Sequence, residues 1–328
     1  MSKAKVLITG AGGFIGHHLA TSLKQRGYWV RGVDIKQPEF CPSSADEFLL
    51  LDLRDFNNCL KAAAGVDHVY ALAADMGGMG FIANNHARIL YNNSAINLHT
   101  IEAARQCGVK KYLYTSSACV YPEFLQTDAD VKPLKEEDAY PAQPQDAYGW
   151  EKLISERLCT HYREDFGMQT YIVRFHNIFG PQGTWDGGRE KAPAAVCRKV
   201  ATAKLTSNPT VEIWGDGEQT RSFCFIDDCV EGIYRLMNSG YHEPLNLGQD
   251  RLISINDLAR LVASIAGIEV ELKHVPGPMG VRGRNSDNNR LRQVLGWEPQ
   301  ITLEEGLQRT YAWIESQVRA TLYVSRAG

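Results

Sequence analysis

The stretch VLITGAGGFIG at residues 6–16 decides the fold of this 328-residue chain. Its apolar first half has the pattern of a buried strand. Glycines at positions 10, 13 and 16 follow, and a helical pattern extends over Gly13–Arg26. Glycines at such a turn allow a tight bend, close packing of helix on strand, and close approach of the backbone to a phosphate group. The stretch therefore predicts the opening strand and helix of a parallel α/β sheet with a dinucleotide site.

Short apolar runs and amphipathic segments alternate through the rest of the first half. The predicted strands are Val6–Thr9, Trp29–Val33, Phe48–Leu51, His68–Leu72, Lys111–Thr115 and Gln169–Phe175. Helical patterns separate them, among them Asn92–Cys107 and Asp146–Phe166. Strands that alternate with helices at this spacing form a parallel sheet with helices on both faces. We therefore predict an α/β fold with a doubly wound parallel Rossmann sheet.

The pattern changes after Arg174. Glycines and prolines are frequent between residues 180 and 193, and we expect loops to dominate as far as Pro209. Ser254–Gly267 has the pattern of a capped amphipathic helix that ends at glycine. We predict a Rossmann domain of residues 1–178 and 219–250, and a smaller C-terminal α/β substrate-binding domain of residues 179–218 and 251–328. Ligands of such sheets bind at the carboxyl ends of the strands, where we expect the site.

Composition argues against several classes of protein. The net charge of −3 does not favour nucleic-acid binding. No apolar run is long enough to span a membrane, and a strand-like segment stands where a cleavable leader would lie, so we expect a cytoplasmic protein. The eight cysteines include no Cys-x-x-Cys pair, so we predict reduced thiols and no metal site.

A carboxylate at the end of the second predicted strand indicates which dinucleotide binds. Asp34 stands roughly twenty residues after the glycines, where it can hold a ribose 2′-hydroxyl and repel a 2′-phosphate, so NAD is favoured over NADP. Asp52 follows the third strand and is either an adenine contact or a solvated turn residue. The predicted cofactor residues are Gly10, Gly13, Phe14, Ile15, Gly16, Asp34 and Asp52, together with Tyr148 and Lys152.

Tyr148 and Lys152 are four residues apart in a helical pattern and therefore share one helix face. A tyrosine with its ordinary pKa near ~10 is a poor base at neutral pH. A lysine ammonium beside it, with a positive nicotinamide ring, favours the phenolate and predicts a lowered pKa. Ser117 follows a predicted strand, where its hydroxyl can hydrogen-bond the substrate oxygen that exchanges the proton. The set predicts proton transfer coupled to hydride transfer.

The Gly-x-x-Gly-x-x-Gly spacing resembles the extended short-chain dehydrogenase/reductase superfamily. Longer segments across nearly the whole chain are similar to the GDP-mannose 3,5-epimerase family within it. These segments are AADMGGMGFI (73–82), SSACVYPEF (116–124), PQDAYG (144–149), RFHN (174–177), GGREKAP (187–193) and RGRNSDN (282–288). An extra stretch around Ala203–Pro209 is expected to lengthen one loop. We expect His176, in one of these segments, to be a hydrogen-bonded structural residue.

The resemblance implies a GDP-sugar substrate and a three-part reaction. Oxidation of the hexose at C4 makes the hydrogens at C3 and C5 acidic, both centres are inverted, and C4 is then reduced again. By resemblance, Cys119 is the base and Lys191 the opposing acid. The catalytic set is Ser117, Cys119, Tyr148, Lys152 and Lys191. The substrate contacts implied are Gly77, Ser117, Ala118, Cys119, Asn177, Glu190, Lys191, Ala192, Lys199, Gln219, Thr220, Arg221 and Arg284. Lys199 and Arg284 suit a diphosphate chemically.

Other functions stay open at this point. A nucleotide-sugar 4-epimerase would need Tyr148 and NAD but neither Cys119 nor Lys191. A 4,6-dehydratase would want an Asp-Glu pair after Ser117, where this chain has Ala118 and Cys119. A non-catalytic NAD-binding protein on the same fold is a third possibility. The apolar faces of Asn92–Cys107 and Asp146–Phe166 lead us to expect a homodimer.

Overall fold

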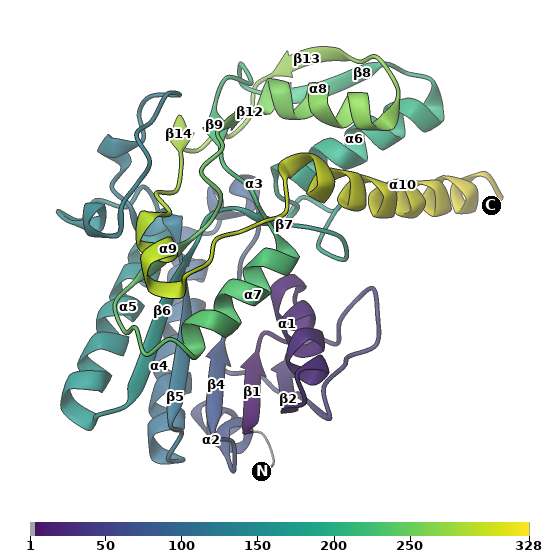
Figure 1. The fold of residues 1–328 in the computed structure, drawn as a ribbon. Helices are drawn as coiled ribbons and strands as arrows, with labels where there is room; N and C mark the ends of the chain where they lie inside the picture. Colours follow the sequence, from purple (N-terminus) through teal and green to yellow (C-terminus); the bar gives the residue numbers. More distant parts are fainter. Residues whose placement is uncertain (1–3, 328) are drawn as a thin grey trace.

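The computed structural model describes residues 4–327 of the chain. Its central element is a parallel sheet of seven strands (Figure 1). The strand order is β3-β2-β1-β4-β5-β6-β11, and every neighbouring pair is parallel. The strands are β1 (Lys5–Thr9), β2 (Trp29–Asp34), β3 (Glu47–Leu50), β4 (His68–Ala71), β5 (Lys111–Ser117), β6 (Gln169–Phe175) and β11 (Leu245–Leu247). The six strands predicted from the sequence are therefore confirmed.

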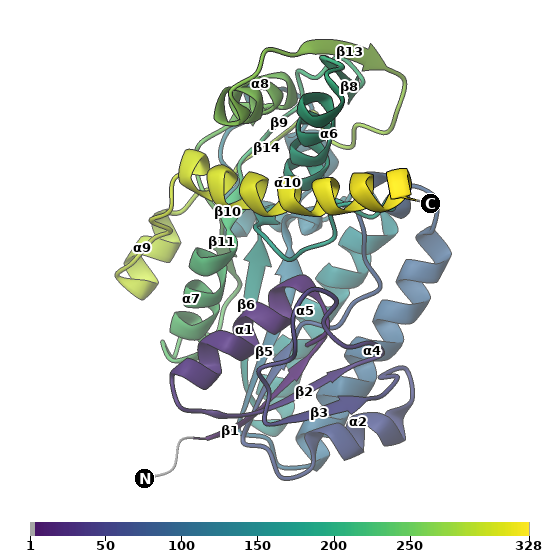
Figure 2. The ribbon, with the colours of Figure 1, turned by 90° about the vertical axis from the view of Figure 1, so that its right-hand side faces the viewer.

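Helices cover both faces of this sheet (Figures 1 and 2). One face carries α1 (Phe14–Gln25) and α7 (Ile226–Met237), and the other carries α2 (Phe56–Ala63), α4 (His86–Gln106) and α5 (Ala147–Phe166). Successive side chains of a strand point to opposite faces. Accordingly, Val6 and Ile8 of β1 join the apolar cluster under α1, whereas Leu7 joins the cluster under α2 and α4. The doubly wound Rossmann sheet is confirmed.

The capped helix predicted near residue 260 is also confirmed. Helix α8 spans Ile255–Ala266, and the Ser254 hydroxyl accepts a hydrogen bond from the Asp257 backbone N–H at 3.0 Å. Gly267 ends the helix with a left-handed φ of 70°. The start and stop signals were local, so the sequence alone was sufficient to place this element.

The expectation that loops dominate as far as Pro209 is wrong, because helix α6 spans Ala192–Thr206. Pro193 lies in its first turn, where a missing backbone N–H breaks no helical hydrogen bond. Val196 and Val200 lie four residues apart and are buried, which gives the helix its apolar face. The stretch expected to lengthen a loop therefore begins inside this helix, which ends where Ser207 adopts a left-handed conformation.

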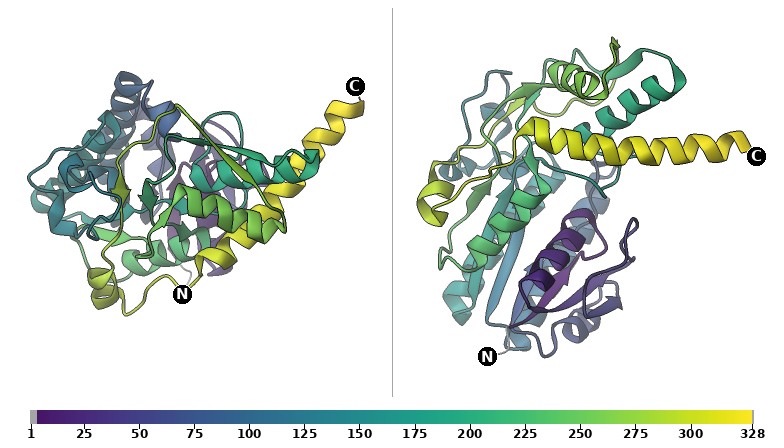
Figure 3. Two further views of the ribbon diagram at one scale, coloured as in Figure 1. Left: turned by 90° about the horizontal axis from the view of Figure 1, so that it is seen from above. Right: turned by 45° about the vertical axis from the view of Figure 1, so that its right-hand side comes forward.

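The remaining elements lie mostly beyond the carboxyl ends of the sheet strands (Figures 2 and 3). The additional strands are β7 (Ile178–Phe179), β8 (Thr210–Trp214), β9 (Thr220–Arg221), β10 (Cys224–Phe225), β12 (Ile253–Ser254), β13 (Glu271–Val275) and β14 (Gly283–Arg284). The additional helices are α3 (Met79–Ile82), α9 (Asn289–Leu295), α10 (Leu303–Ala327) and the 3₁₀ turns η1 (Ala118–Val120), η2 (Glu123–Leu125) and η3 (Glu136–Ala139). Helices α6, α8 and α10 pack on one another, and β8 pairs with β13.

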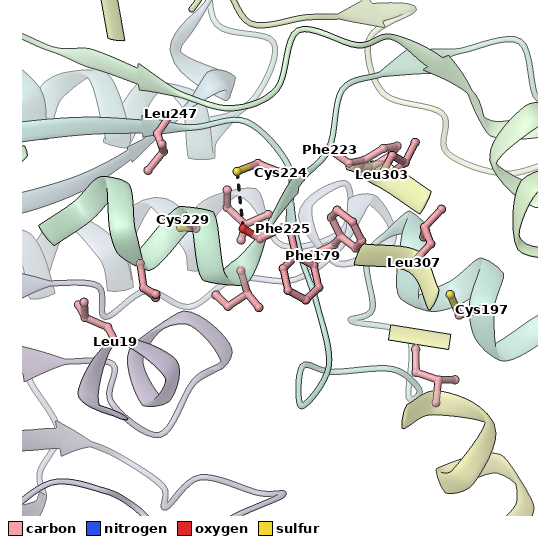
Figure 4. Packing of buried hydrophobic residues seen from close by; sticks show 14 of the residues in the cluster. Leu19, Phe179, Cys197, Phe223, Cys224, Phe225, Cys229, Leu247, Leu303 and Leu307 are labelled. Atoms are coloured by element: carbon pink, nitrogen blue, oxygen red, sulfur yellow. Dashed lines mark hydrogen bonds between the residues drawn. The ribbon is translucent and has the colours of Figure 1, made fainter. Parts of the chain in front are cut away.

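One apolar cluster connects these elements to the sheet. Figure 4 shows Leu19 of α1, Phe225 of β10 and Leu307 of α10 as members of that cluster, with a further member, Cys197 of α6, near Leu307. The division into two domains stays a prediction, and this cluster extends across the boundaries we drew. Within residues 4–327, no helix combines the length and apolar character required to cross a membrane.

Candidate functional site

The glycine turn after β1 has the shape that a dinucleotide phosphate needs. A Cβ atom on Gly12 would lie 2.1 Å from the Lys36 carbonyl oxygen, and one on Gly16 would lie 2.1 Å from the Gly10 carbonyl oxygen. Only glycine fits at these positions, so the backbone N–H groups at the start of α1 stay accessible to an anion. The residues present therefore fit a dinucleotide.

Asp34 lies at the end of β2, next to this turn. Its carboxylate accepts hydrogen bonds from the backbone N–H groups of Gly12 at 3.0 Å and Ile35 at 2.7 Å. Burial raises its pKa from the ordinary value, and these backbone bonds partly offset the effect. Asp52 is instead paired with Arg54, with the closest contact at 2.6 Å, and its predicted adenine contact stays a prediction. Among the described residues, no three His, Cys, Asp or Glu side chains are grouped to hold a metal ion.

The carboxyl end of β5 and the start of α5 bring three predicted residues together. Ser117 ends β5, and its hydroxyl accepts a hydrogen bond from the Cys119 backbone N–H at 3.2 Å. The Ser117 side chain also lies close enough to the Tyr148 phenol to oppose part of the rise in its pKa. A Cβ on Gly149 would lie 2.2 Å from the Cys119 carbonyl oxygen, so this glycine lets α5 approach the turn that carries the thiol.

Lys152 and Tyr148 share one buried face of α5, as predicted. The Lys152 ammonium donates a hydrogen bond to the Thr115 carbonyl at 2.9 Å and lies 5.4 Å from the centroid of the Tyr148 ring. Burial nevertheless raises the pKa of Tyr148 well above its ordinary value, with smaller contributions from Cys119 and Glu151. The expected lowering of this pKa is therefore not achieved by the protein's own groups, because desolvation raises it and the Ser117 side chain opposes this only in part.

Positive charges from several elements surround the Cys119 thiol. Arg284 of β14 donates a hydrogen bond from Nη1 to Cys119 Sγ at 3.2 Å. Lys152 of α5, Lys191 at the start of α6 and Arg221 of β9 each interact electrostatically with the same thiol. Positive charge favours a thiolate over a thiol, so these surroundings suit a sulfur that accepts a proton.

Three of these cations have lowered pKa values, and burial is the largest cause for each, as it is for Lys152. The Lys191 side chain reaches solvent, but the protein around its ammonium removes enough water to lower the pKa, and Cys119 and Cys229 only partly oppose this. Burial and the charge of Arg284 lower the pKa of Arg221 to about 9. A lysine whose pKa is lowered donates its proton more readily, which suits the acid predicted for Lys191.

The predicted substrate residues of β9 and of the turn after β6 lie next to one another. Asn177, with a left-handed φ of 46°, donates a hydrogen bond to the Ser222 carbonyl at 2.9 Å. The Thr220 hydroxyl donates to the Ala129 carbonyl. Gln219 is buried, and its Oε1 has no hydrogen-bond partner among the described residues. An acceptor of this kind is available to a ligand's donor.

The segment after β4 meets the loop before α6. The Gly78 backbone N–H, one residue after Gly77, donates to the Arg189 carbonyl at 3.0 Å. The next residue, Glu190, accepts a hydrogen bond from Arg198 at 2.8 Å. Lys199 donates to the Glu212 carbonyl of β8 at 2.6 Å, and burial lowers its pKa. The contacts of Gly77, Ala118, Glu190, Ala192 and Lys199 with substrate stay predictions.

A sequence-family model described as the NAD dependent epimerase/dehydratase family matches residues 6–248. The chain belongs to this family. It is 55% identical to the GDP-mannose 3,5-epimerase of Arabidopsis thaliana over 316 residues, which are 96% of this chain and 83% of that protein. It is 54% identical to GDP-mannose 3,5-epimerase 1 of Oryza sativa subsp. japonica over 318 residues, with the same coverage. A UDP-glucose 4-epimerase of Thermotoga maritima, solved with UDP-glucose, is 27% identical with a TM-score of 0.85 and covers 97% of this chain and 99% of its own.

Membership of the NAD dependent epimerase/dehydratase family confirms the cofactor predicted from the glycine turn and Asp34. The expectation that His176 is hydrogen-bonded within the fold is also confirmed. His176 is fully buried, its Nε2 lies 3.1 Å from the Asn246 Oδ1, and burial lowers its pKa to about 3.

Several buried polar groups near the site of this NAD dependent family member were not anticipated. Glu151 precedes Lys152, is fully buried, and accepts hydrogen bonds from Asn93 and Asn97 of α4, each at 3.0 Å. Gln126 contacts Arg284 at 2.6 Å. Glu151 could have been identified from the sequence, because it directly precedes Lys152 in a helical pattern. No local pattern could have indicated Gln126, because its partner is 158 residues away.

Proposed function

We propose that this chain is a GDP-mannose 3,5-epimerase that converts GDP-D-mannose to GDP-L-galactose and GDP-L-gulose. The proposal is supported by the identity of 55% with a relative of that name, and by the position of the predicted residues around Cys119. The observation that carries it is the position of the Cys119 thiol, which follows Ser117 at the end of β5, receives a hydrogen bond from Arg284 at 3.2 Å and also interacts with Lys191. A site built for C4 chemistry alone needs neither the thiol nor Lys191.

The first step is oxidation of the sugar at C4. NAD, which the glycine turn and Asp34 would hold, would supply the hydride acceptor and donor. Tyr148 removes the proton from the C4 hydroxyl and returns it at the end, and Ser117, which lies beside the phenol, would hydrogen-bond the same substrate oxygen. Lys152, fixed on the Thr115 carbonyl, places a positive charge beside the phenol and stabilises its ionised form during transfer.

The C4 ketone then makes the C–H bonds at C3 and C5 acidic. The Cys119 thiolate takes a proton from carbon, so that an S–H bond forms and the C–H electron pair moves into an enolate. Lys191 delivers a proton to the opposite face of the same carbon, and its lowered pKa favours that release. Return of the hydride to C4 completes an isomerisation with no net redox change.

Incubation of the purified protein with GDP-mannose, followed by separation of the nucleotide sugars, tests the proposal. Formation of GDP-L-galactose and GDP-L-gulose is the expected result. Formation of a C4 epimer alone would instead identify a 4-epimerase. Retained NAD with no turnover would point to a non-catalytic NAD-binding protein.

Cys119→Ala separates the two kinds of chemistry. We expect solvent deuterium to stop entering C3 and C5, while bound NADH still forms and is seen at about 340 nm. Cys107→Ala is the matched control, since Cys107 is also a free and partly exposed thiol. Deuterium at both carbons in the Cys119→Ala product would show that another residue is the base.

We also propose a homodimer formed through α4 and α5, which pack side by side. Both helices expose large apolar side chains: Tyr91 is 74% exposed, Ile154 58% and Leu98 50%. An open apolar depression next to Ile154 is lined by Tyr140 and Trp150. A second copy would cover this surface. Light scattering of the unaltered protein should give twice the mass of one chain, and the Ile154→Glu substitution should lower the measured mass. A monomeric mass for the unaltered protein would contradict the proposal.

The cytoplasm is the location that we propose for this activity. All eight cysteines are free thiols, which is the state maintained in a reducing compartment. Fractionation of cells that express the tagged protein tests this location.

A further inference from the structure

Two contacts fix the orientation of the Arg284 guanidinium. Its Nε donates a hydrogen bond to the Gln126 Oε1 at 2.6 Å, and its Nη1 donates to Cys119 Sγ at 3.2 Å. A guanidinium is rigid and planar, so fixing two of its N–H directions fixes the whole group. The diphosphate contact suggested for Arg284 by the sequence stays a prediction, and in the structure this cation also donates to the sulfur.

We propose that Gln126 is a positioning residue that holds Arg284 against Cys119, and that Arg284 thereby serves the proton transfers at C3 and C5. This inference rests on the proposed function. Arg284 stays protonated throughout and transfers no proton. It stabilises the negative sulfur before Cys119 takes the proton from carbon.

Gln126 is itself held firmly in place. It is 1% exposed, and its Nε2 donates hydrogen bonds to the carbonyls of Tyr121 and Pro122, each at 3.1 Å. These two bonds orient the amide so that its oxygen is presented to Arg284. The Gln126 carbonyl also accepts the Arg282 backbone N–H at 2.9 Å, two residues before Arg284. Gln126 therefore fixes both the side chain of Arg284 and the strand that carries it.

The other ionisable groups that face Cys119 do not replace this contact. Lys152 and Tyr148 come from α5, Lys191 from the start of α6, and Arg221 from β9, and each interacts with the thiol electrostatically. Arg284 donates a hydrogen bond directly to the sulfur, and charge-assisted bonds of this kind are the stronger class. Without the Gln126 oxygen, the Nε–H loses its buried partner and the guanidinium is free to turn away.

Alkylation of Cys119 by iodoacetamide measures the reactivity of the sulfur and needs no sugar substrate. With Gln126→Leu we expect the alkylation rate of the Cys119 peptide at pH 7.5, followed by mass spectrometry, to fall roughly tenfold. Alkylation of Cys107 in the same sample is the internal reference. Gln145→Leu is the matched control, because Gln145 is exposed on a neighbouring segment and its side chain bonds only Glu123 among the described residues. An unchanged rate in Gln126→Leu overturns the proposal.

A double-variant cycle shows whether Gln126 acts through Arg284. Arg284→Gln alone should lower the alkylation rate at least as far, and adding Gln126→Leu to it should change nothing further. Independent, multiplying effects would overturn the positioning role. In the sugar assay, Gln126→Leu should slow deuterium entry at C3 and C5 more than NADH formation, whereas general damage to the fold would slow both equally.

The two proposals fail in different ways. If GDP-mannose is not converted at all, the proposed function fails, but the alkylation cycle still reports on Gln126 and Arg284. If Gln126→Leu does not fold, judged by loss of NAD binding, Gln126→Asn takes its place. That variant keeps the amide but withdraws its oxygen by one carbon, and the same selective loss of Cys119 alkylation is expected. Equal alkylation in Gln126→Asn and the unaltered protein would refute the proposal.

Discussion

Replacing Glu156 with glutamine should destabilise the protein by about 3–5 kcal/mol, because it breaks a fully buried ion pair. Arg174 of β6 and Glu156 of α5 are 2% and 3% exposed, and two hydrogen bonds of 2.8 and 2.7 Å join them. Arg174 also donates to the Tyr121 hydroxyl and the Glu136 carbonyl. The pair therefore ties β6, α5 and the segment after β5 together beneath the site.

The size of the effect follows from what the substitution leaves behind. Burial opposes the charge of Arg174, but Glu156 and Tyr121 together raise its pKa above the ordinary value. An arginine cannot lose its proton to escape a dry environment, so Glu156→Gln leaves an uncompensated buried cation. Domains are typically stable by about 5–15 kcal/mol, so this loss is a large share of the total.

Urea unfolding at pH 7 measures the loss as a shift in the midpoint at constant slope. Glu304→Gln is the matched control: Glu304 also receives two hydrogen bonds from one arginine, Arg251, both at 2.7 Å, but the two side chains are 42% and 53% exposed. Solvent screens that pair, so its loss should cost less than about 1 kcal/mol. If Glu156→Gln costs no more than Glu304→Gln, burial does not govern the strength of these pairs and the reasoning is refuted.

Four further outcomes are expected. Tyr148→Phe should abolish C4 oxidation, seen as no 340 nm absorbance of bound NADH on adding GDP-mannose; normal absorbance would remove Tyr148 from its role. Asp34→Ala should weaken NAD binding roughly 10- to 100-fold, measured by calorimetry, since a charged hydrogen-bond acceptor is lost, and unchanged affinity would contradict the assigned site. His176 has a folded pKa of about 3, below its unfolded value, so its stabilising contribution is present above pH 6.5 and is lost as the pH falls. Between pH 7 and pH 5 this loss is about 2 kcal/mol, and in urea unfolding the His176→Gln protein should lose that much less stability over the same range. An unchanged pH dependence would contradict this. Gly149→Ala should push α5 away from the Cys119 carbonyl and lower turnover of GDP-mannose while NAD binding persists, a result that normal turnover would exclude.

The sequence was sufficient wherever the pattern is local. The glycine turn, the alternation of strands with helices, and the shared helix face of Tyr148 and Lys152 depend on residues a few positions apart. All three agree with the structure. Helix α6 was not predicted, because the glycines before it and Pro193 in its first turn are typical of a loop. Proline, however, is also common in the first turn of a helix.

Other features depend on tertiary contacts and could not be predicted in this way. Arg284 and Cys119 are 165 residues apart, and no local pattern joins them. The charge of Lys152 led us to expect a lowered pKa for Tyr148, but burial, which no local sequence pattern reports, is the largest influence on it and raises it. The Arg174–Glu156 pair spans two elements and became visible only when their packing was known.

We expect the apolar cluster that joins Leu19 to Leu307 to couple the unfolding of the C-terminal elements to that of the sheet. Helix α10 cannot detach without exposing side chains that continue the packing beneath the phosphate-binding turn. The free energy of dinucleotide binding at the turn after β1 should therefore also stabilise helices that do not contact the dinucleotide. Heating should melt both halves in one transition, and a bound cofactor should protect the distant C-terminal helix from proteases.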